Sequence, residues 1–273
     1  MRRSFDVFRH AGVRFSRDGC VFLAQALAFN ALFSIIPLGL LAVAALGYVY
    51  GSSEGQALLL SVIDDVAPAL HDLVAENIKN AIAFRGLSGA IALVALVWSG
   101  KNLFQALAYA LNRALSVPAG RPIVHDIALS IVMLPAMGLL LLVSTLVPPV
   151  VTFFTHLGGF SETFTPQAAA YGTSIVLIFI VAATLYTFLP NRHLPWTFGI
   201  PGAVFTAIAY ELAQIGFTTF TAHTNLFHIY GALSTVFALL IWFYLMGLIF
   251  LYGAELSAAW REGANVTAGP NSE

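Results

Sequence analysis

Charged side chains are scarce in this sequence of 273 residues. Lysine and arginine number 12 and aspartate and glutamate 13, so 9% of the residues are charged, whereas a soluble domain carries about 25%. A chain of this length could bury a good core, but too few charges remain to cover a surface in water. The formal net charge of -1 also excludes a global basic field, so we expect no nucleic-acid partner.

Cysteine is almost absent, since Cys20 is the single one in the sequence. One thiol excludes an internal disulfide and leaves no thiol cluster for zinc or iron–sulfur. The sequence also lacks a G-x-S-x-G elbow, a Walker loop, an H-E-x-x-H motif and a Cys/His cluster. We therefore expect no enzyme activity, no catalytic residue, no metal site and no cofactor.

What the sequence does have is long apolar runs. Hydrophobic residues make up 59% of the chain and the mean hydropathy is +0.86. A membrane-spanning helix needs about 20 mostly apolar residues. Six stretches qualify, at about residues 21–50, 86–109, 127–154, 168–189, 197–221 and 230–254. The sequence therefore predicts an all-α, polytopic membrane protein with six transmembrane helices.

The few basic residues predict the orientation, because Lys and Arg concentrate in loops that stay in the cytoplasm. Five arginines precede the first span, and ten of the 12 basic residues fall on one side of the predicted membrane. Both termini are then cytoplasmic, as an even number of spans requires.

Three regions follow from this topology. Residues 1–19 form a basic amphipathic N-terminus on the inner leaflet, and residues 20–260 form the six-span domain. Within that domain, residues 51–85 form an external segment of amphipathic helical character. We favour a lid on the outer ends of the spans over a membrane-surface or partner-binding helix. Residues 261–273 are rich in Gly, Asn, Pro and Ser, which predicts a disordered cytoplasmic tail.

Glu211 is the ionisable residue deepest in a predicted span. Its insertion at bilayer depth costs about 2.5 to 3.5 kcal/mol, which makes it a functional candidate. Gln214 and Thr218 follow at i+3 and i+7, so the three share a helix face that we expect to point at the bundle interior or a wet cavity. A substrate pathway and an interhelical hydrogen-bond clamp both fit this face.

Polar residues also share a face of the first span. Asn30 and Ser34 are four residues apart, which places both on one side of a helix. Helix packing is the favoured role, and lining a substrate pathway is the second.

Charged residues mark the predicted inner boundary. We hypothesise an ion pair between Lys101 and Glu255; the alternative has Lys101 reaching toward headgroups and Glu255 in water. Arg192 lies in a short turn between two prolines, which favours a rigid reverse turn over a contact with lipid phosphate or an anionic solute.

Several short motifs, in this order, resemble the YihY/BrkB family of bacterial inner-membrane proteins, also called the ribonuclease BN-like or UPF0761 group. The upstream pieces are Ala-Phe-Asn-Ala-Leu-Phe-Ser-Ile-Ile-Pro (28–37) and Leu-Asn-Arg-Ala-Leu (111–115). The others are Leu-Tyr-Thr-Phe-Leu-Pro-Asn (185–191), Pro-Gly-Ala (201–203), Tyr-Glu-Leu-Ala (210–213), Ile-Tyr-Gly-Ala-Leu (229–233), Leu-Ile-Trp-Phe-Tyr-Leu (240–245) and Tyr-Gly-Ala-Glu-Leu (252–256). Asn30 departs from the pattern, in which many members have an aromatic. The resemblance implies a six-span protein of the bacterial cytoplasmic membrane.

Three functions compete. Transport or lipid translocation is the leading hypothesis, with membrane lipids and a small solute or lipid substrate as partners and Glu211 in the pathway. An envelope scaffold or assembly factor docking through residues 51–85 is the alternative. A ribonuclease ranks third, because the predicted cytoplasmic loops are short and hold few His, Asp or Glu. An oligomer is compatible with all three.

Overall fold

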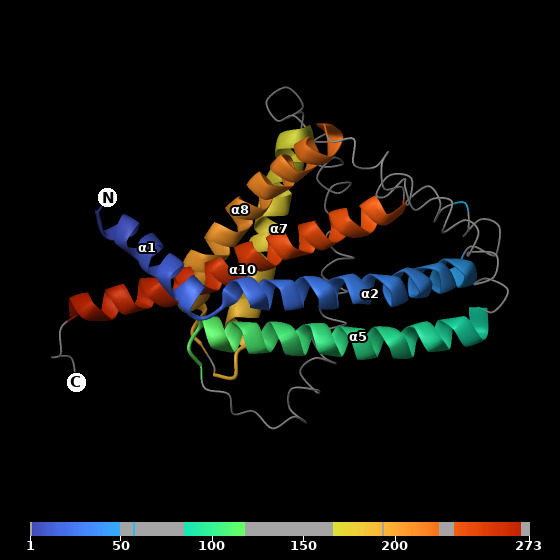
Figure 1. The fold of residues 1–273 in the computed structure, drawn as a ribbon, viewed down its shortest axis with the longest axis horizontal. Helices are drawn as coiled ribbons and strands as arrows, with labels where there is room; N and C mark the ends of the chain where they lie inside the picture. The colour runs from blue at the N-terminus through green and yellow to red at the C-terminus, as the bar shows by residue number, and fades with distance from the viewer. Residues whose placement is uncertain are drawn as a thin grey trace, which may run out of the picture. The chain divides into compact units, whose positions relative to one another are not determined.

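The computed structural model describes residues 2–49, 57, 85–117, 166–192, 194–223 and 232–268, and the regular elements in these ranges are all helices (Figure 1). The helices are α1 (Arg2–Arg17), α2 (Cys20–Val49), α5 (Arg85–Ala114), α7 (Pro166–Phe188), α8 (Trp196–His223) and α10 (Ala232–Ala268). The all-α prediction is confirmed for these residues.

Five of the predicted spans correspond to observed helices. Helices α2, α5, α7 and α8 begin within two residues of the expected positions, because long, mostly apolar runs favour continuous helix. The predicted span at 127–154 lies outside the described residues, as does the external segment 51–85 apart from Ala57 and Arg85.

Two of the described helical stretches are long and apolar enough to cross a membrane, Trp196–Thr221 and Leu233–Glu262. A third results if Asp6–Arg17 and Cys20–Ile35, which meet at a bend of 69°, count as one broken span. Ser174–Phe188 is a shorter apolar helix. The count of six spans and the cytoplasmic termini stay predictions.

The chain divides into two compact units. The first unit comprises Met1–Gln25, Phe104–Gly216 and Leu245–Glu273, and the second comprises Ala26–Leu103 and Phe217–Tyr244. Helices α2, α5, α8 and α10 contribute residues to both units. Each unit is described separately below.

In the first unit, α8 and α10 approach closely at two glycines. A Cβ atom added to Gly253 would lie 2.8 Å from the carbonyl oxygen of Gly202. Small residues let helix backbones meet in this way inside membranes. The buried hydroxyl of Tyr186 on α7 donates to the Phe250 carbonyl at 2.6 Å and lies 2.8 Å from the Thr206 hydroxyl, so α7 is bonded to both helices.

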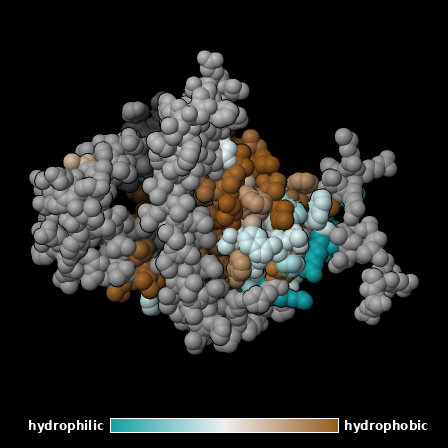
Figure 2. Space-filling view, turned by 180° about the vertical axis from the view of Figure 1, so that it is seen from behind, coloured by the Kyte–Doolittle hydropathy of each residue, from teal (hydrophilic) through white to brown (hydrophobic). Residues whose placement is uncertain are grey.

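Helix α1 packs its apolar side on α10. Val7 and Ala11 are buried and form a cluster with Leu256 and Ala259. The turn into α2 passes through Gly19 with φ +69, a left-handed conformation that glycine adopts without strain. Figure 2 shows hydrophilic side chains gathered toward the end of the molecule that carries α1, beside exposed hydrophobic ones.

The C-terminal end of α10 differs from the prediction. The helix continues to Ala268, so residues 261–268 are helical and not a disordered tail. The reason is tertiary: Arg261 lies over the Phe198 ring at 5.5 Å and Glu262 binds Arg14. These contacts hold the first two residues of the predicted tail within the helix.

Candidate functional site

A buried arginine lies at the centre of the most polar part of the first unit. Arg14 is 4% exposed, and its Nε donates to Glu255 Oε2 at 2.8 Å while Nη1 donates to Glu262. Its Nη2 donates to the Ala114 carbonyl at 3.0 Å and to the Ser116 hydroxyl at 3.2 Å. The guanidinium therefore joins α1 to the end of α5 and to α10.

Glu255 is the buried acidic partner in this group. Its exposed fraction is 0%, and its second oxygen accepts a hydrogen bond from the Cys20 thiol at 3.5 Å. We name Arg14, Cys20, Ser116, Glu255 and Glu262 the arginine cluster. Burying two charges is costly, so a fully bonded pair of this kind fixes the arrangement of helices more than it adds net stability.

Glu255 has partners that the sequence did not suggest. Its two carboxylate oxygens accept hydrogen bonds from Arg14 and Cys20, and its burial contradicts the alternative in which it lies in water. The ion pair with Lys101, a residue of the other unit, stays a prediction. Lys101 has its ammonium 4.9 Å from the centre of the Trp98 ring, a cation–π arrangement within the second unit.

A small cavity of about 150 Å³ opens beside the arginine cluster. We name it the arginine pocket. It is lined by the polar residues Arg14, Ser116, Arg192, Arg261 and Glu262 and the apolar residues Leu115, Val117, Leu194, Phe198 and Ala258. The turn that carries Arg192 is held by its neighbour Asn191, whose backbone N–H donates to the Asn112 side chain at 2.8 Å.

Glu211 is buried in α8, as its predicted depth suggested. It is 6% exposed, and its Oε1 has no hydrogen-bond partner within the part of the chain that the structure describes. Gln214 and Thr218 on the same helix are exposed. The three side chains therefore do not share one enclosed environment, and their place along a pathway stays a prediction.

Asn30 and Ser34 make local bonds. The Asn30 amide donates to the Ala26 carbonyl at 2.8 Å, and the Ser34 hydroxyl donates to the Asn30 carbonyl at 2.9 Å. Such bonds to the preceding turn satisfy polar side chains within their own helix. Neither bond joins α2 to another helix, so these two contacts do not supply the packing role that the sequence favoured.

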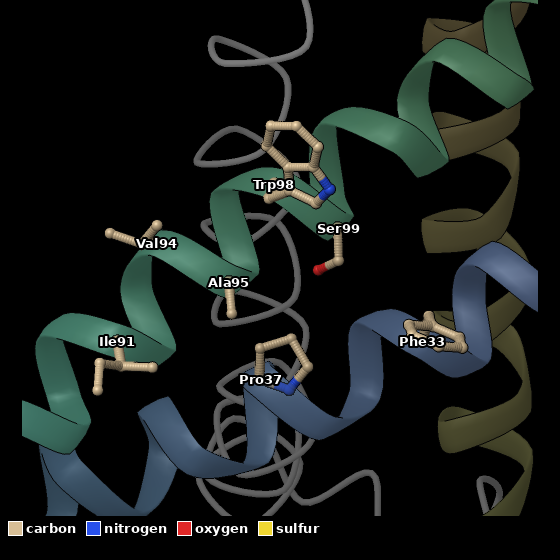
Figure 3. A pocket seen from close by; sticks show the side chains of 7 residues that line it. All are labelled: Phe33, Pro37, Ile91, Val94, Ala95, Trp98 and Ser99. Atoms are coloured by element: carbon tan, nitrogen blue, oxygen red, sulfur yellow. The ribbon is translucent and has the colours of Figure 1, made fainter.

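The second unit contains an apolar groove between α2 and α5, of about 670 Å³ (Figure 3). Pro37 of α2 and Ala95 of α5 point toward each other across it in Figure 3. Seven residues line the groove: Phe33, Pro37, Ile91, Val94, Ala95, Trp98 and Ser99.

Among the described residues, no three His, Cys, Asp or Glu side chains come together in a way that could hold a metal ion. The arginine cluster instead combines one cation with two carboxylates, a thiol and a hydroxyl, which suits ion pairing.

The chain resembles known proteins over most of its length. The sequence profile of the family described as virulence factor BrkB matches residues 11–273. This chain belongs to the BrkB family. The ribonuclease-like protein YfkH of Bacillus subtilis (strain 168) is 29% identical over 244 residues, which are 85% of this chain and 86% of YfkH.

Two further relatives are named as UPF0761 membrane proteins. The one from Alteromonas mediterranea is 27% identical over 254 residues, covering 91% of this chain and 85% of that protein. The one from Pseudoalteromonas translucida is 28% identical over 242 residues, covering 86% and 79%. No solved structure matches this chain. The protein is thus a membrane protein of the BrkB family.

Three of the motifs behind the resemblance meet in the first unit of this BrkB-family chain. Tyr186, Gly202, Gly253 and Glu255 come from three separate pieces, and their contacts join α7, α8 and α10, while Glu255 also holds Arg14.

Sequence reasoning did not single out the binding partners of Glu255, although the spacing held a signal. Arg14 lies seven residues after Val7 and three after Ala11, on the apolar face of α1, where an arginine needs a buried partner. Glu262 lies seven residues after Glu255 and so shares its face of α10.

Proposed function

We propose that this BrkB-family protein moves a lipid or a small solute across the bacterial cytoplasmic membrane, and that Glu211 is a polar site on the route. The supporting observation is the Glu211 carboxyl, buried in an apolar helix with one oxygen that has no hydrogen-bond partner among the described residues. Ionisable groups inside membranes are expensive to place and mark substrate, ion or proton pathways.

The absence of a donor to this oxygen among the described residues supports a functional role over a structural clamp. A clamp requires the carboxyl oxygens to be bonded to donors on neighbouring helices, because a buried unbonded oxygen costs about 1–3 kcal/mol. An oxygen left without such a donor is available to a substrate, an ion or a proton that occupies the site for part of a cycle.

The test is movement across a vesicle membrane by the purified full-length protein. Proteoliposomes are assayed for scrambling of a fluorescent phospholipid and for release of trapped small solutes. We expect the wild type to exceed protein-free vesicles and Glu211→Gln to fall at least about tenfold, which corresponds to ~1.4 kcal/mol in the barrier.

The matched control is Leu212→Gln, which adds the same amide at the neighbouring position of α8, where the side chain is 66% exposed. It should keep wild-type activity. Wild-type vesicles that move no lipid or solute above background would refute the proposal. Equal activity of Glu211→Gln and wild type would remove Glu211 from the route.

A further inference from the structure

We propose that the arginine pocket binds a phosphate group. This binding site is separate from the route proposed at Glu211 and does not require that the protein transport anything. Three observations support it: two arginines of the pocket have no carboxylate partner among the described residues, the cavity is small, and aromatic residues lie beside it.

Among the described residues, two of the three arginines that line the pocket have no carboxylate partner. Arg14 directs its guanidinium to Glu255, Glu262, the Ala114 carbonyl and Ser116, so four of its five N–H donors are used within the protein. Glu262, the single carboxylate in the lining, is taken by Arg14. Arg192 and Arg261 therefore face the cavity without an ion pair to any carboxylate of the described residues.

Arg192 and Arg261 have no carboxylate partner among the described residues and suit a phosphate group. A guanidinium offers planar, paired N–H donors that match phosphate oxygens, and its charge persists at any physiological pH. Arg261 is steadied by the Phe198 ring at 5.5 Å, which reduces the freedom that the side chain must lose on binding. The Ser116 hydroxyl at the same cavity adds a neutral donor.

The size of the cavity limits the ligand. A cavity of about 150 Å³ is small, although it has room for several water molecules. A phosphate group has five heavy atoms and fits this space, whereas a nucleotide base and sugar would have to remain outside.

Two exposed tryptophans favour a phospholipid as the source of the phosphate. Trp196 begins α8 four residues after Arg192, and Trp260 directly precedes Arg261; their exposed fractions are 54% and 52%. Tryptophan collects at the headgroup level of membranes. The pocket therefore lies near the depth at which phospholipid phosphates are found.

The experiment measures binding by the purified full-length protein in detergent, with two probes. Native mass spectrometry counts bound phosphatidylglycerol against diacylglycerol, which has the same chains and no phosphate, and calorimetry titrates inorganic phosphate. We expect phosphatidylglycerol to bind and diacylglycerol not to bind. Arg192→Gln/Arg261→Gln should weaken phosphate-group binding at least about tenfold, because two charge-assisted contacts are lost.

Arg9→Gln/Arg113→Gln is the matched control. It removes two exposed arginines of the same unit that do not line the pocket, and so changes the net charge equally. Weakening by both double variants alike would overturn the proposal, because charge alone would then explain binding. Binding of diacylglycerol as strongly as phosphatidylglycerol, or of neither probe, would also overturn it.

Phosphatidylglycerol and inorganic phosphate distinguish the two possible sources of the bound phosphate group. Binding of phosphatidylglycerol that inorganic phosphate does not displace supports a lipid phosphate, and binding of inorganic phosphate alone supports a free one. Glu211→Gln should bind as the wild type does. A protein that binds phosphate groups and moves nothing across vesicles refutes the proposed function and leaves this inference standing.

Discussion

Replacing Arg14 by methionine would leave Glu255 buried beside an apolar side chain. The carboxylate would keep the Cys20 thiol as its remaining donor, at 3.5 Å, and a thiol is a weak one. The side chains of the pair are 5% and 0% exposed, so the carboxylate would lose its main donor in a buried environment. The perturbation therefore isolates the cost of an unpaired buried charge.

The expected cost is large. Removing one partner of a buried ion pair destabilises a protein by about 3–5 kcal/mol. For a chain of this size, each kcal/mol lowers the unfolding temperature by roughly 2–4 °C. Arg14→Met should therefore lower it by on the order of 10 °C. Arg14→Met/Glu255→Met removes both charges and should recover most of the loss, because apolar pairs replace buried ion pairs at little or no cost.

Thermal unfolding of the detergent-solubilised protein, followed by tryptophan fluorescence, measures these shifts. Lys101→Met is the control, since it removes the cation that the sequence suggested as the partner of Glu255. It should shift the midpoint far less than Arg14→Met. A double variant no more stable than Arg14→Met would refute the explanation by an unpaired carboxylate, and a larger loss in Lys101→Met would refute the pairing itself.

Two further predictions concern the same unit. Gly253→Ala should destabilise the protein by about 1–3 kcal/mol, because the new methyl group collides with α8; Gly216→Ala, with nothing within 4 Å, should be neutral or stabilising in the same unfolding assay. Cys20 is fully buried, so a maleimide should label it only after denaturation in SDS, and rapid labelling of the folded protein would contradict the packing of the arginine cluster.

The helices were predictable because their signal is local. A run of apolar residues without charge specifies a membrane helix whatever its neighbours are, and the expected stretch 21–50 is observed as Cys20–Val49. The end of α10 was not predictable in this way. From the sequence, Arg261 and Glu262 were expected to begin a polar tail. In the structure they contact Phe198 and Arg14, which are distant in sequence.

The arginine cluster depends on partners that are distant in sequence. Arg14 and Glu255 are separated by 241 residues, and no spacing rule connects them. The sequence suggested Lys101 as a partner of Glu255 because both were expected near the inner boundary, and it left open the alternative in which Glu255 lies in water. Helical periodicity shows that Arg14 lies on a buried face, but only the packing of α1 on α10 shows which carboxylate it meets.

The rule that Lys and Arg concentrate in cytoplasmic loops treats all arginines alike. The structure distinguishes them by their ion-pair partners. Arg14 forms a buried ion pair with Glu255, and the exposed Arg17 pairs with Asp18. Arg192 and Arg261 face a cavity with no carboxylate of their own among the described residues. If the positive charge served topology alone, moving it between exposed positions would not alter ligand binding. Comparing Arg192→Gln/Arg261→Gln with the charge-matched Arg9→Gln/Arg113→Gln therefore tests whether Arg192 and Arg261 bind a ligand or serve only membrane orientation.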